Sequence, residues 1–412
     1  MLTEIGKRVK KASVEIATAS TDDKNKILKA IADALRENCD EILKANALDL
    51  ENGRNNGMSE ALLDRLMLNK DRVEGMAQGV EGLISLPDPV GKILWEDTRP
   101  NGLKIQRVSS PLGVIGIIYE ARPNVTSDAA ALAIKSGNSA ILRGGKEAFN
   151  SNSAIMDIMR NAVEGVGFNP DIIELVRDTS RESSTALMRM NGFVDVLIPR
   201  GSAKLINAVV QNSTVPVIET GAGNCHIYVD EFADIDMAAE IVYNAKTQRI
   251  SVCNTAESLL IHKNIAEFAL IAIKAKLDEK NVILYGDEIA RTICPDIEKA
   301  TEEDWATEYL DYKMSVKIVS SLEEATEHIR KYSTGHSESI ITENTENAEK
   351  FMNMVDSSAV YHNASTRFTD GGEFGFGAEI GISTQKLHAR GPLGLEQLNS
   401  FKYKIYGNGQ VR

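Results

Sequence analysis

One cysteine stands out among the residues that could do chemistry. Cys253 lies in the stretch KTQRISVCNTAESLLIH, at 246–262, where a short polar loop separates a helix-like segment from an apolar run. A side chain at such a junction of elements usually faces a cleft, and a thiolate in a cleft can act as a nucleophile. The alternative is a half-buried structural thiol, which composition alone favours.

Three other polar segments could share a site with Cys253. VIETGAGNCHIYVD precedes it at 217–230, YEARPNVTSDAA supplies a polar turn at 119–130, and the glycine-rich DGGEFGFGAEIGIST lies at 370–384. The glycine-rich segment is too irregular for a helix or a strand, which is typical of a loop that forms a site. With these neighbours, Cys253 becomes a candidate nucleophile.

The remaining cysteines indicate the redox environment. Cys39, Cys225, Cys253 and Cys294 lie far apart, with no C-x-x-C spacing. This pattern predicts neither a disulfide framework nor a cysteine-based zinc site, and it favours free thiols in a reducing compartment. The histidines show no metal-binding spacing either, so we expect no metal.

Length and charge set the class of protein. The chain has 412 residues, 43% of them hydrophobic, which is enough for two or three domains. A net charge of -13 argues against general nucleic-acid binding. The N-terminal stretch has no apolar core of signal-peptide length, and no later segment approaches about 18 uninterrupted apolar residues. We predict a globular, cytoplasmic protein.

The elements that position the candidate site begin with helices and a hairpin. Residues 20–50 open with Ser/Thr/Asp capping chemistry and place four apolar residues on one face, namely Ile27, Ile31, Ala34 and Leu35. The segment at 93–110 has two strand-like halves around Pro100-Asn101-Gly102, a turn signal that predicts a hairpin. The tail FKYKIYGNGQV alternates like a strand and could pair with another subunit.

Short apolar runs separated by helix-compatible segments predict parallel sheets. The first series has strands at 112–119, 139–144, 172–176, 194–199 and 215–220. The second runs through HIYVD, ESLLIH, NVILYG, MSVKIV, ESIIT and SAVYHN. We place a nucleotide-binding domain at 1–224, a catalytic domain at 225–384, and a return to the first domain with a final strand at 385–412.

The chain resembles the aldehyde dehydrogenase superfamily in six segments taken in order: SPLGVIGIIYEARPNVTSDAAALAIKSGNSAILRGGKEA, IETGAGNCHIYVD, KTQRISVCNTAESLL, TEYLDYKMSVKIV, STGHSESIIT and FGFGAEIGISTQKLHARGPLGLEQL. The resemblance covers essentially the whole chain. It implies an α/β fold with a Rossmann-type cofactor domain, a second α/β catalytic domain and a small β oligomerisation element made of the 93–110 hairpin and the C-terminal strand. One branch is especially similar, the branch that reduces L-glutamate 5-phosphate to L-glutamate 5-semialdehyde and phosphate, the second step of proline biosynthesis.

In that family a cysteine matching Cys253 is the nucleophile, and it forms a thioester that accepts hydride from a nicotinamide. The resemblance implies that the Asn124 side chain and the Cys253 backbone N–H form the oxyanion hole; Asn124 could instead cap a helix. Glu219 matches a water-activating glutamate of aldehyde-oxidising relatives, yet hydrolysis of the thioester would defeat the reaction, so we exclude it from catalysis. Arg249 and Lys246 are near Cys253 in sequence, and we favour their facing solvent.

For the cofactor we expect NADPH. The G-x-G-x-x-G fingerprint is absent. By resemblance, the segment ILRGGKEA holds the adenosine ribose, and there Arg143 and Lys146 favour a 2′-phosphate, although a basic surface turn is the alternative. Gly201 and Ser202 stand where a helix begins, so their N–H groups can face pyrophosphate. Glu308 resembles the glutamate that holds the nicotinamide ribose.

For the substrate, we expect Arg122 to meet an anionic group, and Ser383 and Thr384 resemble loop residues that hold the substrate tail in relatives. Expected partners are glutamate 5-kinase and further copies of the chain, in a homo-oligomer. An aldehyde-oxidising or coenzyme A-acylating dehydrogenase is the alternative within the class. A scaffold subunit that has kept the fold without the activity is the alternative outside it.

Overall fold

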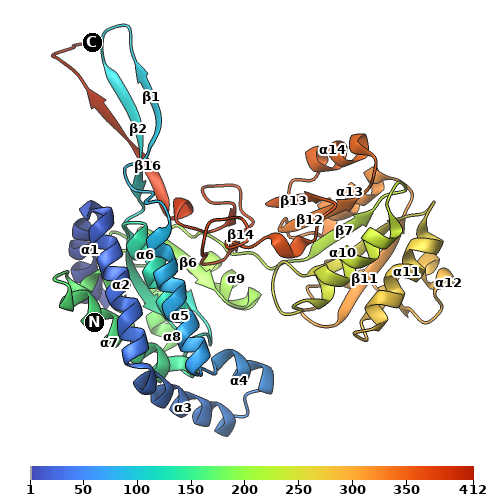
Figure 1. The fold of residues 1–412 in the computed structure, drawn as a ribbon, viewed down its shortest axis with the longest axis horizontal. Coiled ribbons are helices and arrows are strands. Elements are labelled where there is room, and N and C mark those ends of the chain that lie inside the picture. Colours follow the sequence, from blue (N-terminus) through green and yellow to red (C-terminus); the bar gives the residue numbers. More distant parts are fainter. Residues whose placement is uncertain (1) are drawn as a thin grey trace. The chain divides into compact units, whose positions relative to one another are not determined.

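The computed structural model describes residues 2–412, and the chain forms two compact units. Unit 1 runs to Thr220 and also takes in Gly375–Gly381 and Leu393–Arg412. Unit 2 is made of Gly221–Phe374 and Ile382–Pro392. Figure 1 shows the ribbon of both units coloured along the chain, and each unit is described by itself below.

Unit 1 begins with five helices: α1 (Leu2–Thr18), α2 (Thr21–Glu37), α3 (Cys39–Asn55), α4 (Glu60–Leu66) and α5 (Lys70–Gly82). The predicted start of α2 is confirmed, because Ser20 and Asp23 form a capping box at its first turn. Of the predicted apolar face, Ile27, Ile31 and Leu35 are fully buried. Ala34 lies at the edge of that face and is only partly buried.

The sheet of unit 1 is parallel, with the strand order β5-β4-β3-β6. Its strands are β3 (Val114–Tyr119), β4 (Ser139–Arg143), β5 (Ile173–Leu175) and β6 (Val196–Arg200). Its helices are α6 (Asn124–Lys135), α7 (Phe149–Gly165), α8 (Arg181–Met188) and α9 (Ala203–Asn212). The strands are buried on both faces, which explains why they read as continuous apolar runs in the sequence. These four predicted strands are confirmed.

The fifth predicted strand, at 215–220, is wrong. The segment makes only an isolated bridge, between Leu197 and Val217, beside β6. Leu197 donates to the carbonyl of Pro216 over 2.8 Å and Ile218 donates to Leu197 over 2.9 Å. Because Pro216 has no N–H, the ladder cannot extend through it as a regular strand.

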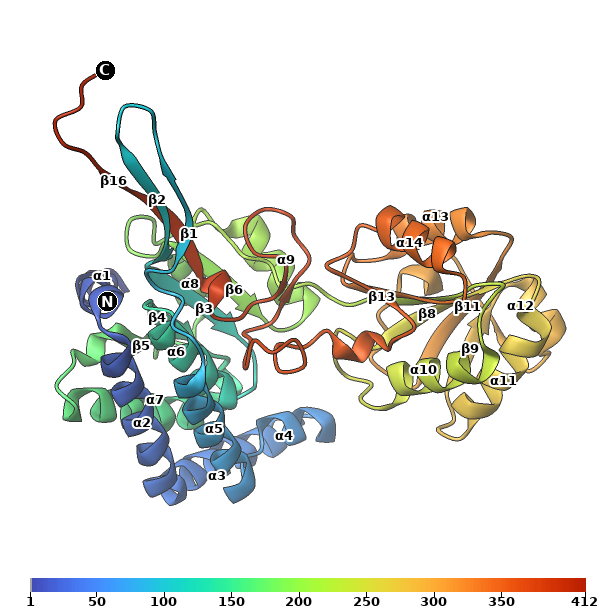
Figure 2. The same ribbon diagram turned by 45° about the horizontal axis from the view of Figure 1, so that its top comes forward.

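A three-stranded antiparallel arm belongs to unit 1 and is drawn from a second direction in Figure 2. It consists of β1 (Ile93–Thr98), β2 (Lys104–Pro111) and β16 (Asn399–Tyr406), in the order β1-β2-β16. The hairpin is confirmed, and Gly102 supplies the left-handed residue of its turn with φ 86°. The tail is a strand as predicted, and it pairs with β2 of its own chain over eight residue pairs.

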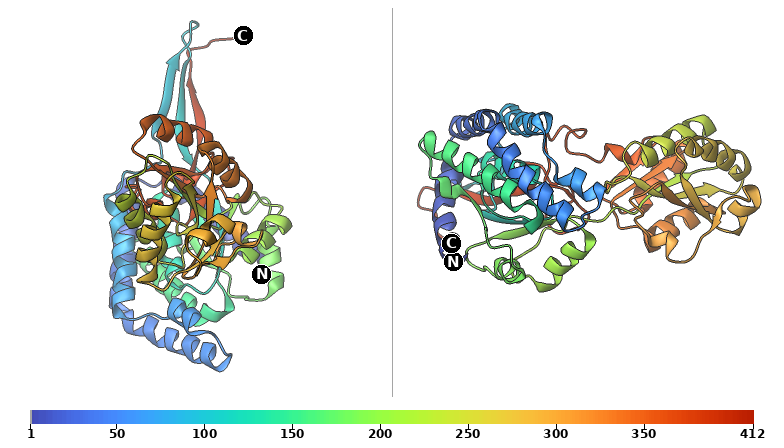
Figure 3. Two further views of the ribbon diagram at one scale, coloured as in Figure 1. Left: turned by 90° about the vertical axis from the view of Figure 1, so that its right-hand side faces the viewer. Right: turned by 90° about the horizontal axis from the view of Figure 1, so that it is seen from below.

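Unit 2 is built on a seven-stranded parallel sheet with the order β10-β9-β11-β8-β7-β12-β13, seen from two further directions in Figure 3. Its strands are β7 (Cys225–Val229), β8 (Ala256–His262), β9 (Ile283–Gly286), β10 (Glu298–Lys299), β11 (Lys313–Val319), β12 (Ser337–Ile341) and β13 (Ala359–His362). Its helices are α10 (Ile235–Thr247), α11 (Ala266–Asp278), α12 (Glu288–Ile293), α13 (Leu322–Tyr332) and α14 (Thr345–Met354). The six predicted strands are confirmed, and β10 is a short addition.

The glycine-rich segment is irregular over most of its length, as predicted. Its only strand is β14 (Ile382–Ser383), which pairs with β15 (Gly391–Pro392) in unit 2. Between residues 2 and 412, no helix is long and apolar enough to cross a bilayer. Across the same residues, no cluster of three or more His, Cys, Asp or Glu side chains could hold a metal ion.

Candidate active site

Cys253 lies where the sequence predicts it, in the loop between α10 and the amino end of β8, and it is partly exposed. A tight turn shapes this loop. The Thr255 N–H donates to the Val252 carbonyl over 3.1 Å, and its hydroxyl donates to the Arg249 carbonyl over 2.7 Å. The backbone around Cys253 is therefore held by its own neighbours before any other segment touches it.

A second segment of unit 2 packs directly on the backbone of Cys253. A Cβ placed on Gly223 would lie 1.4 Å from the Cys253 carbonyl oxygen, so no residue other than glycine fits there without movement. The Gly223 N–H donates to the Glu308 carboxylate over 2.7 Å. Gly223 therefore contacts both the backbone of Cys253 and the carboxylate of Glu308, the residue predicted to hold a ribose.

The buried thiol of Cys225 contacts the same carbonyl of Cys253. Its Sγ donates to the Cys253 oxygen over 3.2 Å and lies 3.7 Å from His336 Nδ1. Burial raises the pKa of Cys225 well above its usual value, and the nearby Glu338 adds to the shift. Cys225 therefore stays a protonated donor rather than a second nucleophile.

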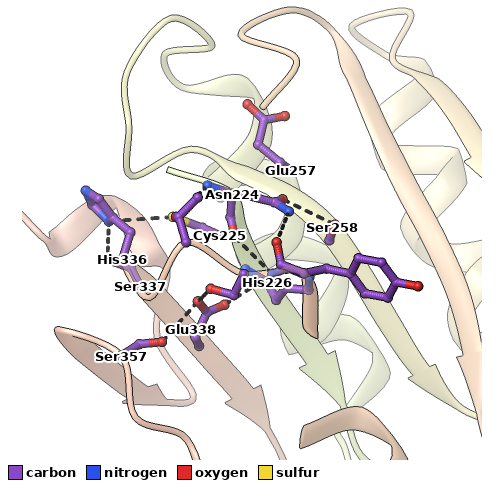
Figure 4. A network of polar contacts seen from close by, with 12 residues as sticks. Asn224, Cys225, His226, Glu257, Ser258, His336, Ser337, Glu338 and Ser357 are labelled. Carbon is purple, nitrogen blue, oxygen red and sulfur yellow. Dashed lines mark hydrogen bonds and ion pairs between the residues drawn. The ribbon is translucent and has the colours of Figure 1, made fainter. Parts of the chain in front are cut away.

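His336 and Glu338 extend this buried network along β12 (Figure 4). His336 Nδ1 lies 2.8 Å from the Ser337 hydroxyl. The Glu338 carboxylate accepts the His226 backbone N–H over 2.6 Å and the Ser357 hydroxyl over 3.2 Å. These buried polar groups thus tie the amino ends of β7 and β12 together.

Arg367 is a residue near the nucleophile that sequence reasoning missed. Its guanidinium bonds the Asn254 side chain and donates to Gln248 over 3.0 Å. Burial lowers the pKa of Arg367, and repulsion from Arg249 lowers it further, while the Cys253 sulfur acts in the opposite sense. The sulfur is therefore close enough to Arg367 for the two to interact electrostatically. The only signal in the sequence was an arginine in the polar turn ASTRFTDGG.

The expectation that Lys246 faces solvent is wrong. Lys246 is fully buried and pairs with the fully buried Glu257 over 2.5 Å. Burial lowers the pKa of Lys246 and raises that of Glu257 to about 7. Lys246 lies on the side of α10 that packs onto β8, which a count of residues from Cys253 could not reveal. Arg249 is exposed, as expected.

Asn124 and Arg122 lie in unit 1, in the turn after β3. Asn124 is the exposed first residue of α6, and its amide donates to Asp128 over 2.9 Å. Pro123, not Asn124, occupies the N-cap position of this helix. Burial raises the pKa of Asp128 to about 6. Arg122 is partly buried, and its N–H donates to the Glu120 carbonyl over 2.6 Å. Glu219 is also partly buried.

The two cations predicted to meet a 2′-phosphate differ in their surroundings. The Arg143 guanidinium donates to the carbonyls of Gly144, Thr179 and Ser180, so it anchors a loop to the end of β4. Burial lowers its pKa. Lys146 is exposed, and no ion pair involves it among residues 2–412. Lys146 is the cation of the two that solvent reaches.

The helix predicted at Gly201 and Ser202 is confirmed, but its first turn already holds an anion. Ser202 caps α9, and both its N–H and its hydroxyl donate to the Glu120 carboxylate, each over 2.8 Å. A Cβ on Gly201 would lie 2.7 Å from the same carboxylate. The Glu120 carboxylate thus occupies the N-terminus of α9, where we expected pyrophosphate to bind. An anion within reach of a helix N-terminus is stabilised there.

Ser383 and Thr384 lie in unit 2 beside the segment that packs on Cys253. Ser383 is fully buried in β14, and its hydroxyl has no partner among residues 2–412. A Cβ on Gly221 would lie 2.5 Å from the Thr384 methyl carbon. The Gly221 N–H also donates to Ile382 over 3.0 Å, so the loop around these two residues is joined to the start of unit 2.

The chain has two parallel-sheet units, and the second carries a cysteine just before β8. This arrangement agrees with the family that matches the chain. The model of the aldehyde dehydrogenase family matches residues 3–307. An acetylating aldehyde dehydrogenase from Geobacillus thermoglucosidasius has the same fold, with a TM-score of 0.70 at 18% identity over 100% of this chain and 97% of that chain.

Relatives that match over the full length of the chain identify one branch of this family. The gamma-glutamyl phosphate reductase of Lachnospira eligens is 57% identical over 100% of this chain and 99% of its own. The crystal structure of the gamma-glutamyl phosphate reductase from Thermotoga maritima has a TM-score of 0.98 at 50% identity, over 100% of this chain and 99% of that chain. The chain therefore belongs to the aldehyde dehydrogenase family and, within it, to the gamma-glutamyl phosphate reductases. Membership implies a nicotinamide dinucleotide as cofactor.

Proposed function

We propose that the protein reduces L-glutamate 5-phosphate to L-glutamate 5-semialdehyde and phosphate with NADPH, through a thioester on Cys253. One observation carries the proposal: in a chain 57% identical to a gamma-glutamyl phosphate reductase over its full length, Cys253 lies in a loop packed by Gly223 and Cys225. The product has an amine and an aldehyde that can close a five-membered ring, which places the reaction in proline synthesis.

Cys253 takes part in each step of the proposed reaction. Its thiolate adds to the acyl carbon of the substrate, the bond from that carbon to the phosphate oxygen breaks, and phosphate departs with the electron pair. A thioester remains. When bound, NADPH supplies a hydride to the thioester carbonyl carbon. The carbon–sulfur bond then breaks, the aldehyde leaves, and the thiolate is restored.

The charges around Cys253 suit the first step. Arg367 and Arg249 lie close enough to each other to repel, and Arg367 interacts electrostatically with the Cys253 sulfur. Positive charge beside a cysteine favours its thiolate, and it also attracts a phosphorylated substrate. Glu219 is given no catalytic step, because a water-activating base would hydrolyse the thioester; a structural role or a contact with the substrate amine is open to it.

The cofactor proposal rests on unit 1. Lys146, exposed after β4, suits a 2′-phosphate, and this supports NADPH over NADH. Gly144 and Gly145 let the backbone pass close to neighbouring side chains at this strand end. A Cβ on Gly144 would lie 2.2 Å from the nearest side-chain atom, and a Cβ on Gly145 would lie 2.5 Å from one. Arg143 shapes the adjoining loop through its three carbonyl contacts. In unit 2, Glu308 is the residue proposed for the nicotinamide ribose.

Other residues are proposed for the intermediate and the substrate. The Cys253 N–H and the Asn124 amide are the proposed oxyanion donors, and one amide hydrogen of Asn124 is held by Asp128. Arg122 is proposed for an anionic group of the substrate. Ser383 and Thr384 are proposed for its tail, and the buried hydroxyl of Ser383, which has no partner within the described part of the chain, supports a polar ligand there.

We further propose that the arm joins copies of the chain into a homo-oligomer. Its two outer strands, β1 and β16, carry exposed large apolar residues, among them Trp95, Phe401, Tyr403 and Ile405. Edge strands with such side chains are ready to pair with another chain.

The reverse reaction tests the function directly. Glutamate 5-semialdehyde, supplied as its cyclic form with NADP, should give NADPH absorbance only when phosphate is present, and Cys253→Ala should abolish it. NADPH formation without phosphate would instead indicate an aldehyde-oxidising enzyme. Formation that requires coenzyme A in place of phosphate would indicate an acylating one.

A further inference from the structure

Unit 2 contains a cavity of about 280 Å³ that the proposed chemistry does not use. It lies at the carboxyl ends of β7, β8 and β11, where Glu231, His262 and Ser320 follow or end these strands. Cys253 precedes β8, at the amino end of the same sheet. The cavity and the nucleophile are therefore at opposite edges of one sheet.

The path of the chain explains why a crevice opens at this edge. Helices α10 and α11, which follow β7 and β8, pack in one apolar cluster with Ile227 and Leu259. Helices α13 and α14, which follow β11 and β12, pack in another cluster with Tyr228 and Leu260. Successive residues of a strand face opposite sides of a sheet. Loops from neighbouring strands thus diverge to opposite faces, and α/β proteins bind ligands in crevices of this kind.

One buried side chain directs an unused donor to the cavity. His262, at the end of β8, is 5% exposed and lines the cavity. Its Nδ1 accepts the backbone N–H of Asn264 over 3.2 Å, so the ring proton lies on Nε2. No hydrogen bond joins that Nε2–H to another of residues 2–412, and the atom is open to solvent. A donor on a nearly buried ring that lines the cavity is available to a ligand that supplies an acceptor.

Opposite charges flank this donor. Lys263, next in the chain, is exposed, and no ion pair involves it within residues 2–412. The Asn264 side chain donates to Glu231 Oε2 over 2.7 Å. Asn264 therefore holds the ring of His262 with its backbone and the carboxylate of Glu231 with its side chain. A cation, a neutral donor and an anion thus line the same cavity.

The other charged groups of the lining are already satisfied by the protein. Asp230 accepts bonds from the hydroxyls of Tyr228 and Thr342 and from the Asn347 amide, over 2.7 to 3.0 Å. Glu323 and Lys350 pair with each other. The groups left for a ligand are the Nε2–H of His262, the ammonium of Lys263 and the second oxygen of Glu231.

We propose that this cavity binds a small zwitterion of the α-amino acid class. Its carboxylate accepts from His262 Nε2 and pairs with Lys263, and its ammonium pairs with Glu231. Adjacent groups of opposite charge on the ligand match adjacent groups of opposite charge on the protein. The volume is at the small end of ligand sites, which limits the ligand to a few heavy atoms beyond its charged groups.

Calorimetric titration of the full-length protein tests the site, with glycine and L-alanine as probes. Acetate and methylamine, each with only one of the two charges, are the comparison ligands. We expect both zwitterions to bind and each single-charge compound to bind at least about tenfold more weakly, which corresponds to about 1.4 kcal/mol. Lys263→Gln and Glu231→Gln should weaken the zwitterions by a similar factor.

Matched variants keep the result specific. Lys280→Gln and Glu267→Gln change exposed residues of the same types in unit 2 that do not line the cavity, and they should leave binding unchanged. The proposal fails if neither zwitterion binds, if acetate binds as tightly as glycine, or if Glu231→Gln has no effect. Because the probes are unrelated to reductase turnover, these outcomes are separate from the test of the Cys253 reaction.

Discussion

The thiol of Cys225 donates a hydrogen bond to the carbonyl oxygen of Cys253 over 3.2 Å. One cysteine is the proposed nucleophile, and the other is buried, with a raised pKa that keeps it protonated at neutral pH. The buried thiol is a positioning residue: it fixes the peptide unit that follows the nucleophile. Its contact with His336 extends the same constraint to β12.

Cys225→Ala should therefore lower kcat without unfolding the protein. A net hydrogen bond is worth about 1 kcal/mol, so we expect a loss of about fivefold in kcat with little change in KM. Steady-state kinetics of the reverse reaction measure both constants. Cys294→Ala is the matched control, because it removes another buried cysteine far from Cys253 in sequence, within the cluster that packs α11 and α12. Equal effects of the two variants would assign Cys225 a packing role only.

Gly223→Ala should be more damaging than the loss of Cys225. The added methyl group meets the Cys253 carbonyl oxygen at 1.4 Å, and this oxygen belongs to the backbone, which cannot swing aside. We expect kcat to fall by more than about tenfold, with destabilisation of about 1–3 kcal/mol. Gly75→Ala, in the middle of α5 with open space around it, is the control, and it should raise stability by up to about 1 kcal/mol. Retention of full activity by Gly223→Ala would contradict the described packing.

Breaking the buried pair of Lys246 and Glu257 tests stability instead of chemistry. Lys246→Met leaves an uncompensated buried carboxyl group and should cost about 3–5 kcal/mol in the free energy of unfolding. The double variant Lys246→Met/Glu257→Leu should recover most of that loss. Urea unfolding measures both. Lys29→Met breaks the exposed pairs with Asp33 and Glu81 and should change stability far less, because solvent screens these charges. A Lys246→Met/Glu257→Leu variant as unstable as Lys246→Met would refute the explanation.

Most strands could be predicted because both sheets are parallel and buried, so each strand is an apolar run. The segment at 215–220 has the same composition, but Pro216 cannot donate to a ladder and the chain leaves β6 after one bridge. Propensity alone does not show where a backbone N–H is required. The pairing of the tail with β2 joins residues almost 300 positions apart, which no local pattern encodes.

The candidate site was predictable only in part. Cys253 stood out by its position in a polar loop and by family resemblance. Arg367 did not, because its contact with Asn254 joins residues separated by 113 positions. Lys246 was judged by its proximity to Cys253 along the chain, and Arg143 was assigned by family resemblance. The structure shows that their partners are a carboxylate and three carbonyls brought in by the fold.

Lys146 provides the test of cofactor preference. Lys146→Gln should raise KM for NADPH by about tenfold and leave KM for NADH nearly unchanged, because only NADPH carries the 2′-phosphate. Lys204→Gln removes an exposed cation from α9 and serves as the control. If Lys146→Gln affected both cofactors equally, the lysine would not contact the 2′-phosphate.

Glu120 provides the test of where the pyrophosphate binds. Its carboxylate holds the Ser202 N–H and hydroxyl at the start of α9, so a phosphate arriving there must displace or oppose a negative charge. Glu120→Gln keeps an acceptor of the same shape without the charge. Anion interactions at a helix N-terminus are worth about 0.3–1 kcal/mol, so we expect NADPH to bind about two- to fivefold more tightly to Glu120→Gln, with a small loss of stability. Fluorescence titration of NADPH measures the affinity, and Glu164→Gln, an exposed change on α7, controls for net charge. Unchanged or weaker binding would mean that the α9 N-terminus serves Glu120 as a structural cap, and that pyrophosphate is held by other groups at the carboxyl edge of the unit 1 sheet.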